Sequence, residues 1–327
     1  ILADDLGLDG VGCCGSDTYA KLTPRIDAMA RGGLRFEACF AMPLCGPTRG
    51  VFNTGRYGFR TGGLTNGSWR EGGEGPKAAD EYPIARMLRD AGYATCCAGK
   101  WRQVGETPGA WGFDSWITDE TAGGWYWQKK YNRNGELVEL PEERYLPDVY
   151  HQFAMDFIKA KKDKPFFLYY PTHLVHGPIL KTPDSTRAVP AKDGVQTGGG
   201  QDAREPGSPG QGAARDGDGA SKPETKDYYA DNIAYMDKQV GKVLDEVAAL
   251  GLSENTLVVF SGDNGTAKKS GTLGGREIFG AKGSLLEGGS RVPLIATSYK
   301  LVSKNREILE LDQKQLQLDK ARSLSQQ

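Results

Sequence analysis

The sequence predicts an α/β fold, with a mostly parallel central sheet that is covered by helices on both faces. Short apolar runs typical of strands alternate along the chain with segments whose apolar residues recur at helical spacing. Polar or charged residues follow each apolar run, and ligands of such sheets bind outside the carboxyl ends of the strands. The 327 residues can hold one large domain or two ordinary ones. We therefore expect one edge of the sheet to carry the chemistry.

Five apolar runs are expected to form strands. They span residues 1–3, 34–42, 93–98, 165–170 and 256–260, and the run at 34–42 is expected to be buried. Four segments between them are expected to form helices, at residues 24–31, 82–91, 149–161 and 228–250. A further helix is expected to begin at Cys45, because the proline that follows is tolerated in a first turn, where its missing N–H is not needed.

Two segments do not fit a compact core. Residues 193–220 are rich in Gly, Ser, Pro, Asp and Gln and are predicted to be a disordered surface insertion. Residues 304–327 contain no Gly, Pro or aromatic residue, and their apolar pattern falls short of three heptads, which favours a solvated helix over a coiled coil. The predicted organisation is one large domain over residues 1–298 and an atypical helical tail over residues 299–327.

The composition excludes some classes of partner. The 41 basic and 42 acidic side chains leave a net charge of −1, which argues against nucleic acid or an anionic membrane surface. No apolar stretch reaches about 18 residues, so no membrane span is predicted. The adjacent cysteine pairs Cys13-Cys14 and Cys96-Cys97 match neither a zinc site nor a small disulfide framework.

Cys45 is the most informative single residue. At a helix N-terminus, free backbone N–H groups and the positive end of the helix dipole favour a tetrahedral oxyanion such as sulfate or phosphate. The same field is expected to lower the pKa of a thiol. The residue alone leaves two interpretations open, a buried structural cysteine and a thiolate nucleophile, and the chain offers only three histidines as a base.

Two acidic pairs follow the first and last of the predicted strands. Asp4-Asp5 and Asp263-Asn264 supply carboxylate and amide oxygens, which suit a hard cation such as Ca²⁺ or Mg²⁺ and not zinc. Each pair by itself is also typical of a turn or a helix cap. Their common position after a strand is what favours a cation site.

A third interpretation of Cys45 comes from its neighbours. The run Cys45-Gly-Pro-Thr-Arg49, followed by Thr54-Gly55-Arg56, resembles the signature of the type I sulfatases, arylsulfatase-like members of the alkaline-phosphatase-like superfamily. In that family a formylglycine-generating enzyme oxidises the cysteine to Cα-formylglycine, so the resemblance implies this enzyme as a partner during maturation. Further segments resemble the family in the same order, namely Asp4-Asp5-Leu6-Gly7, Ala98-Gly99-Lys100-Trp101, His176-Gly177-Pro178, Asp263-Asn264-Gly265, and the run that carries Lys282 and Glu287-Gly288-Gly289-Ser290-Arg291-Val292-Pro293.

The resemblance implies a metal-dependent sulfuric ester hydrolase. Its cation, Ca²⁺ or alternatively Mg²⁺, would polarise the ester as a Lewis acid. The residues that would hold it are Asp4, Asp5, Cys45 as formylglycine, Asp263 and Asn264. One hydroxyl of hydrated formylglycine would attack sulfur and the other would drive collapse to aldehyde and sulfate, whereas a serine would remain a stable sulfate ester.

The resemblance also implies roles for four other side chains. Arg49 would position the hydrated aldehyde through its fork of donors. Lys100 would hold the sulfate and the aldehyde-derived oxygen, and Lys282 would bind the sulfate near the leaving group. His176 would protonate the leaving alkoxide.

Arg102 departs from the family pattern, because it stands where the family usually has histidine. A guanidinium stays protonated and cannot act as the base for the collapse step. We expect Arg102 to contact the sulfate or the diol, and water or His173 to take the proton. The resemblance also stops near Ala296, so we expect the family's smaller C-terminal subdomain to be missing from this sequence.

The substrate that the resemblance implies is an aryl or carbohydrate sulfate ester, acted on outside the cytoplasm in the periplasm or after secretion. The aromatic run Trp125-Tyr126-Trp127, within residues 123–131, would either stack on a sugar or aryl ring or pack beneath a loop. Two alternatives stay open: a phosphonate monoester or phosphodiester hydrolase of the same superfamily, and a catalytically impaired relative that binds sulfate esters.

Overall fold

The computed structural model describes residues 1–69, 73, 75–101, 104–119, 125–186, 228–267 and 271–298. The predicted insertion at 193–220 and the predicted tail at 299–327 lie outside these residues, and so does Arg102.

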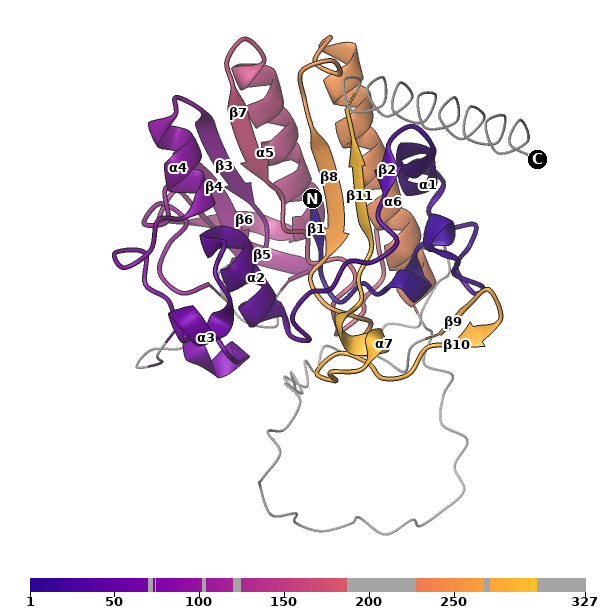
Figure 1. The fold of residues 1–327 in the computed structure, drawn as a ribbon. Coiled ribbons are helices and arrows are strands. Elements are labelled where there is room, and N and C mark those ends of the chain that lie inside the picture. Colours follow the sequence, from indigo (N-terminus) through magenta and orange to yellow (C-terminus); the bar gives the residue numbers. More distant parts are fainter. Residues whose placement is uncertain are drawn as a thin grey trace, which may run out of the picture.

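The core of the molecule is a mixed sheet in two hydrogen-bonded parts (Figure 1). One part has the strand order β1 (Leu2–Ala3), β8 (Val258–Gly262), β11 (Leu294–Thr297) and β2 (Leu34–Arg35). The other has the order β6 (Glu136–Tyr145), β5 (Trp127–Arg133), β4 (Ser115–Asp119), β3 (Ala94–Ala98) and β7 (Phe166–Tyr169). A parallel bridge between Leu2 and Pro171 joins the two parts at β1.

Parallel pairing is concentrated in the middle of this arrangement. β3 is parallel to β4 and to β7, and β1 is parallel to β8. The outer pairs β4/β5, β5/β6, β8/β11 and β11/β2 are antiparallel. The α/β prediction is confirmed, and the central strands are the ones whose carboxyl ends meet at a common edge.

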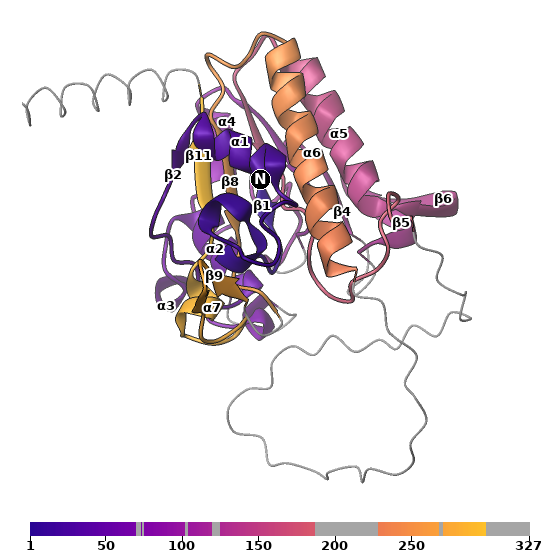
Figure 2. The ribbon, with the colours of Figure 1, turned by 90° about the vertical axis from the view of Figure 1, so that its right-hand side faces the viewer.

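Helices cover both faces of the sheet. The helices of the described residues are α1 (Pro24–Arg31), α2 (Cys45–Thr54), α3 (Gly58–Thr61), α4 (Ile84–Asp90), α5 (Leu146–Lys161), α6 (Tyr229–Ala249) and α7 (Glu287–Ser290). The long helices α5 and α6 lie side by side on one face (Figure 2). α2 and α4 pack together on the other face, and α1 packs against α6 and β11. A short ribbon of β9 (Thr272–Leu273) and β10 (Arg276–Glu277) precedes α7.

The prediction of a buried strand over residues 34–42 is wrong. Only Leu34 and Arg35 pair with β11, at the edge of the sheet. Residues 36–41 still bond to the backbone of residues 290–294, but they do so at the edge of the sheet, where Phe36 and Phe40 are 45% and 67% exposed. The other predicted strands and helices form, with ends shifted by a few residues.

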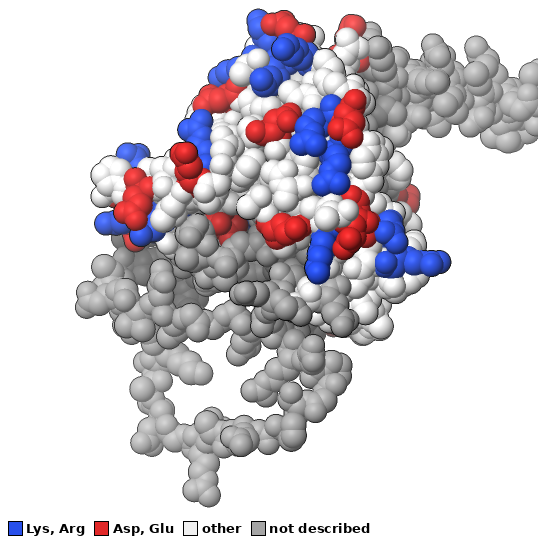
Figure 3. Space-filling view, turned by 90° about the vertical axis from the view of Figure 1, so that its left-hand side faces the viewer, with Lys and Arg blue, Asp and Glu red and all other residues white. Residues whose placement is uncertain are grey.

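The surface agrees with the balanced composition. The face in Figure 3 carries basic and acidic side chains close together, with no large area of one sign. None of the helices in the described part of the chain is long and apolar enough to cross a membrane.

Candidate active site

Strand ends and the start of one helix converge at a single end of the molecule. Ala3 of β1 lies opposite Gly262 of β8 in a parallel register, so the residues that follow, Asp4 and Asp263, emerge side by side. The backbone N–H of Asp5 donates to Asp263 Oδ1 at 3.0 Å. The carboxyl end of β8, α2 and α7 lie at the same end of the ribbon in Figure 1. The site is therefore built at the edge of the sheet where the sequence predicts it.

Four potential cation ligands surround one point. One ligand atom from each of Asp4, Asp5, Cys45 and His176 lies within 4.8 Å of the others. Asn264 is fully buried beside them and donates from Nδ2 to Asp5 Oδ1 at 2.8 Å. Asp4, Asp5 and Asn264 are each at most 1% exposed.

The oxygen atoms of this group fit a hard cation. Among the described residues, Asp4 Oδ1 and Asn264 Oδ1 are buried without a hydrogen-bond partner. A buried acceptor left without a partner costs free energy, and a cation that prefers oxygen ligands would satisfy both atoms. Both oxygen atoms are therefore potential ligands for a divalent cation.

Arg49 lies underneath the acidic pairs. Its guanidinium is fully buried and donates to Asp263 Oδ2 from Nη2 at 2.7 Å and from Nε at 3.1 Å. Nη1 donates to the backbone oxygen of Lys100 at 3.3 Å, and Nη2 is 3.6 Å from Asp4 Oδ1. Two donors of the guanidinium thus bind the carboxyl group of Asp263, so in this structure Arg49 orients Asp263.

Two lysines approach the acidic pairs from different elements. Lys100, which follows β3, is 1% exposed and donates to the Asp4 carboxylate. Lys282 Nζ lies 2.9 Å from Asp5 Oδ1 and 3.2 Å from His176 Nε2. The side chains of Lys282 and His176 keep about 15% of their area exposed, so they form the solvent side of the site.

Burial and charge move several pKa values in opposite directions. Burial opposes ionisation of Asp4, but Lys100 and the other cations together hold the pKa of its carboxyl well below the usual range. Burial and the charge of Asp4 raise the pKa of Asp263 to about 7. Burial, with Lys100 beside it, lowers the pKa of His176 to about 4, so its imidazole is neutral in neutral solution.

The expectation of a low thiol pKa at position 45 is wrong. Cys45 does begin α2, but its side chain is fully buried. Burial raises the pKa of the thiol, and Lys100 and Lys282 lower it by less. A resting thiolate is therefore disfavoured, which weakens the interpretation of Cys45 as a thiolate nucleophile.

The sequence as a whole matches one family. A family model described as sulfatase matches residues 1–317. The chain belongs to the sulfatase family. It is 30% identical to N-acetylgalactosamine-6-sulfatase of Canis lupus familiaris over 90% of this chain and 56% of that protein. It is 28% identical to arylsulfatase A of Homo sapiens over 90% of this chain and 57% of that protein. It spans about half the length of these curated relatives.

Solved structures share the fold of this sulfatase-family chain. It is similar to the crystal structure of Ps i-CgsB in complex with k-i-k-neocarrahexaose, with a TM-score of 0.70 and 26% identity over 92% of this chain and 65% of the other. The crystal structure of the PsFucS1 sulfatase from Pseudoalteromonas sp. is similar in fold alone, with a TM-score of 0.67 and 23% identity over 91% and 61% of the two chains.

Asn66 is a residue of the sulfatase-family site that sequence reasoning missed. Its Oδ1 accepts the backbone N–H of Gly46 at 2.8 Å, and its Nδ2 lies 3.9 Å from Cys45 Sγ. It belongs to none of the motifs that mark the family. Only its contacts with Cys45 and Gly46 at the start of α2 identify it.

Of the two alternatives for the aromatic run, the burial of Trp125 and Tyr126 favours packing inside the protein over stacking on a substrate ring. Trp125 is 9% exposed and Tyr126 is 1% exposed. The Tyr126 hydroxyl donates to the backbone oxygens of His173 and His176, at 3.1 and 2.7 Å. Trp127 is half-buried in β5 and donates from Nε1 to the oxygen of Lys181 at 2.9 Å.

His173 lies behind the site and not on its solvent side. Its side chain is fully buried, and its Nε2 is 3.3 Å from Oδ1 of Asp119, which is buried as well. This position favours a supporting role over the proton transfer that the sequence led us to expect. Arg102 lies outside the described residues, so its expected contact with sulfate stays a prediction.

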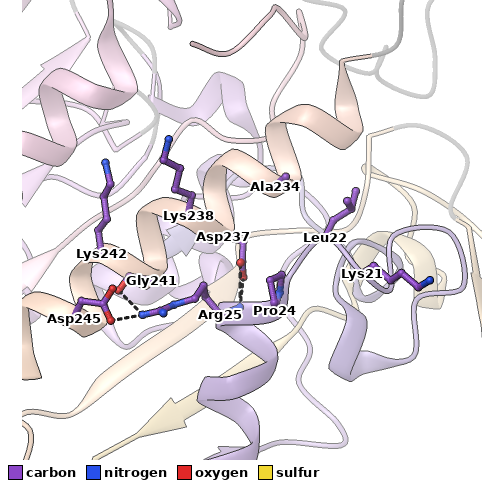
Figure 4. A pocket seen from close by; sticks show the side chains of 10 residues that line it. All are labelled: Lys21, Leu22, Pro24, Arg25, Ala234, Asp237, Lys238, Gly241, Lys242 and Asp245. Atoms are coloured by element: carbon purple, nitrogen blue, oxygen red, sulfur yellow. Dashed lines mark hydrogen bonds and ion pairs between the residues drawn. The ribbon is translucent and has the colours of Figure 1, made fainter. Parts of the chain in front are cut away.

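A hollow of about 430 Å³ between α1 and α6 is separate from the site (Figure 4). Asp237 in this hollow accepts the backbone N–H groups of Arg25 and Ile26, and Asp245 pairs with the Arg25 side chain. None of the predicted site residues lines it.

Proposed function

We propose that this protein hydrolyses a sulfate ester to an alcohol and sulfate, with residue 45 as Cα-formylglycine. The observation that carries the proposal is the convergence of Asp4, Asp5, Cys45 and His176 within 4.8 Å, with Lys100 and Lys282 bonded to the same carboxylates. Membership of the sulfatase family supports the same activity.

The cation that we propose is Ca²⁺, with Mg²⁺ as the alternative. Asp4, Asp5, Asp263, Asn264 and the oxygen of formylglycine would hold it, and it would supply Lewis-acid polarisation of the ester. The buried acceptors Asp4 Oδ1 and Asn264 Oδ1 support a hard, oxygen-binding ion.

The charges of the site support an anionic substrate. The carboxyl groups of Asp4, Asp5 and Asp263 are paired with three cations: Arg49 contacts Asp4 and Asp263, Lys100 contacts Asp4, and Lys282 contacts Asp5. A divalent cation would add two positive charges to this balanced set. The occupied site would then favour the single negative charge of a sulfate ester.

Formylglycine at position 45 would supply, as its hydrate, a hydroxyl nucleophile and a second hydroxyl that allows sulfate to leave. The raised pKa of the Cys45 thiol argues against direct thiolate attack. Asn66, whose Nδ2 lies 3.9 Å from Sγ of Cys45, is the neutral donor that would orient a hydroxyl at this position.

The proton for the leaving group would come through His176. Because burial holds the pKa of His176 near 4, its imidazole must first receive a proton. Lys282 Nζ lies 3.2 Å from its Nε2 and would orient the neutral ring. Burial opposes the charge of Lys282, but Asp5 and Asp4 beside it raise the pKa of its ammonium. The lysine therefore keeps its proton and faces the sulfate, while His176 would take its proton from solvent.

The substrate class that we propose is a carbohydrate sulfate, with an aryl sulfate as the alternative. Relatives named for 6-sulfated N-acetylgalactosamine and for aryl sulfates support these two classes. Export from the cytoplasm and maturation by a formylglycine-generating enzyme remain part of the proposal.

The test uses the full chain produced with and without a formylglycine-generating enzyme. Mass spectrometry of the peptide containing Cys45 should show an aldehyde only in the first preparation, and only that preparation should release sulfate from 6-sulfated N-acetylgalactosamine or an aryl sulfate. Cys45→Ala should release none. Aldehyde-bearing protein that binds sulfated sugars without releasing sulfate would favour the impaired relative. A higher kcat/KM for an aryl phosphonate would favour the phosphonate hydrolase.

A further inference from the structure

The indole of Trp125 lies between two groups of the site. The Lys100 ammonium lies over the ring at 5.4 Å from its centroid. The His176 ring meets the indole edge-on, with centroids 5.1 Å apart and planes at 78°. Only 9% of Trp125 is exposed, so the ring contacts these two side chains and very little solvent.

The segment that carries His176 is fixed through its backbone by the same aromatic run. The indole N–H of Trp125 donates to the backbone oxygen of Gly177 at 3.1 Å. The Tyr126 hydroxyl donates to the backbone oxygens of His173 and His176. This segment has no helix or strand of its own, so these side-chain bonds limit where the His176 ring can lie.

A buried contact between a histidine and a carboxyl group lies behind the indole. The imidazole of His173 stacks on Trp125, with centroids 5.6 Å apart and planes at 25°, and Tyr150 contacts its ring at 5.6 Å. Asp119, the last residue of β4, lies 3.3 Å from His173 Nε2, and both side chains are fully buried. Among the described residues, the remaining polar atoms His173 Nδ1 and Asp119 Oδ2 have no hydrogen-bond partner.

We propose that Trp125 is a positioning residue for Lys100 and His176, and that the Asp119–His173 pair fixes the plane of its ring. Lys100 sits on a flexible stem, and its ammonium also contacts Asp4. The ring face gives the ammonium a second contact besides Asp4 and so limits where it lies beside that carboxylate. The assignment is distinct from simple packing, because it predicts that a ring face is required at this position. Loss of the indole N–H bond to Gly177 should matter less, because the Tyr126 hydroxyl still bonds to the backbone of the same segment.

The kinetic test rests on the proposed function, since it measures sulfate release by the full, formylglycine-bearing chain. Trp125→Leu should lower kcat about tenfold or more and leave KM within about threefold, since the buried ring offers little surface to the substrate. Trp125→Phe keeps a ring face and should stay within about threefold of the parent kcat. Trp116→Leu is the matched control, because Trp116 is a half-buried tryptophan of β4 that packs in another core cluster, and it should leave kcat unchanged.

A second measurement tests the geometry without any activity. In the chain labelled with ¹³Cε-lysine, the resonance of Lys100, assigned by its loss in Lys100→Arg, should be shifted upfield by the ring above it. Trp125→Leu should remove this shift and Trp125→Phe should keep it. If Trp125→Leu does not fold, Asp119→Asn replaces it and should move the same resonance and lower kcat.

The outcomes separate the two proposals. If the parent releases no sulfate from any ester, the proposed function fails, and the Lys100 resonance alone decides whether Trp125 positions the lysine. If the parent is active and neither kcat nor the resonance changes in Trp125→Leu, or in Asp119→Asn when that variant replaces it, the positioning role is overturned. An equal loss of kcat in Trp116→Leu would also overturn it, because packing in general would then explain the effect.

Discussion

At the scale of single residues, Arg49 is the side chain on which the acidic pairs depend most. It is fully buried, so no water screens its charge, and two of its donors bind one oxygen of Asp263. Removing one partner of a buried ion pair leaves the other charge without compensation. Arg49 therefore has a structural task as well as the role that its motif implies.

Arg49→Gln should destabilise the metal-free protein by about 1–3 kcal/mol, because the buried Oδ2 of Asp263 would lose its two donors even when the carboxyl, whose pKa is already about 7, takes up a proton. The free energy of unfolding in urea, measured with a chelator present, checks this. Arg144→Gln is the matched control, because Arg144 and its partner Glu142 are 57% and 67% exposed, and it should cost no more than about 0.5 kcal/mol. Equal losses in the two variants would contradict the account.

Sequence patterns could identify the residues that belong to motifs but not the residues that support them. Asp4, Lys100 and Asp263 lie where the motifs predict. Asn66 and Trp125 reach the site through contacts made only by the folded chain, and their sequence neighbours carry no sign of this. The predicted direction of the Cys45 pKa failed for a related reason, because burial depends on the whole fold.

At the scale of elements, the loop after β8 depends on a close approach to α7. A Cβ atom on Gly265 would lie 1.8 Å from the backbone oxygen of Gly288. The next residue, Thr266, accepts the backbone N–H of Lys282 with its backbone oxygen. The close approach of Gly265 to Gly288 and the bond between Thr266 and Lys282 therefore fix Asn264 and Lys282 relative to each other.

Gly265→Ala should lower kcat/KM by at least about tenfold, because α7 must move away and carry Lys282 with it. Steady-state sulfate release checks this. Gly32→Ala is the control, because a Cβ there comes no closer than 3.4 Å to the oxygen of Ala28, and it should retain activity. Full activity of Gly265→Ala would contradict the proposed coupling.

The helices α5 and α6 share a buried polar network that titrates. The Tyr170 hydroxyl lies 3.4 Å from His151 Nδ1 and donates to Gln239 Oε1 at 2.9 Å. Burial lowers the pKa of His151 to about 4, against about 6.5 for an unfolded chain. The unfolded state therefore binds the proton more tightly. The contribution of neutral His151 to the free energy of unfolding is complete above pH 6.5. It is lost as the pH falls from 6.5 to 4.

Between pH 7 and pH 5 the parent should lose about 2 kcal/mol more stability than His151→Asn. The reason is that the variant has no group at this position to protonate. Urea unfolding at the two pH values measures the difference. The same pH dependence in both proteins would show that His151 does not titrate as the structure indicates.

The helices were predictable because their apolar residues recur at helical spacing, and residues 24–31 form α1 as expected. The strands β5 and β6 were not predicted. β6 is an edge strand whose side chains are mostly exposed, so it has no apolar run to mark it. The opposite error occurred at residues 34–42, where apolar side chains remain exposed beyond the short pairing with β11.

At the scale of the whole molecule, the site is closed by contacts between distant parts of the chain. Asp5 meets Asp263 and Lys282, which are 258 and 277 residues away in the sequence. The order of the strands in the sheet determines which of these residues come into contact. The sequence pattern predicted the class of sheet but not the strand order.

Ca²⁺ should stabilise the whole domain, because it binds the folded site and not the unfolded chain. At about one hundred times its Kd, the gain should be about 2.7 kcal/mol, seen as a rise in Tm over the chelated protein. Asp4→Asn should reduce this rise, whereas Asp245→Asn, outside the site, should leave it unchanged. An equal rise in both variants would mean that Ca²⁺ binds elsewhere.

Sulfate release measured against the aldehyde content of position 45 tests the central claim most directly. Preparations of the full chain with different fractions of formylglycine, quantified by mass spectrometry, would be assayed on one sulfate ester. The account predicts a rate proportional to the aldehyde fraction and no release from protein whose Cys45 remains a thiol. Release by the thiol form, or none by the fully converted protein, would contradict it.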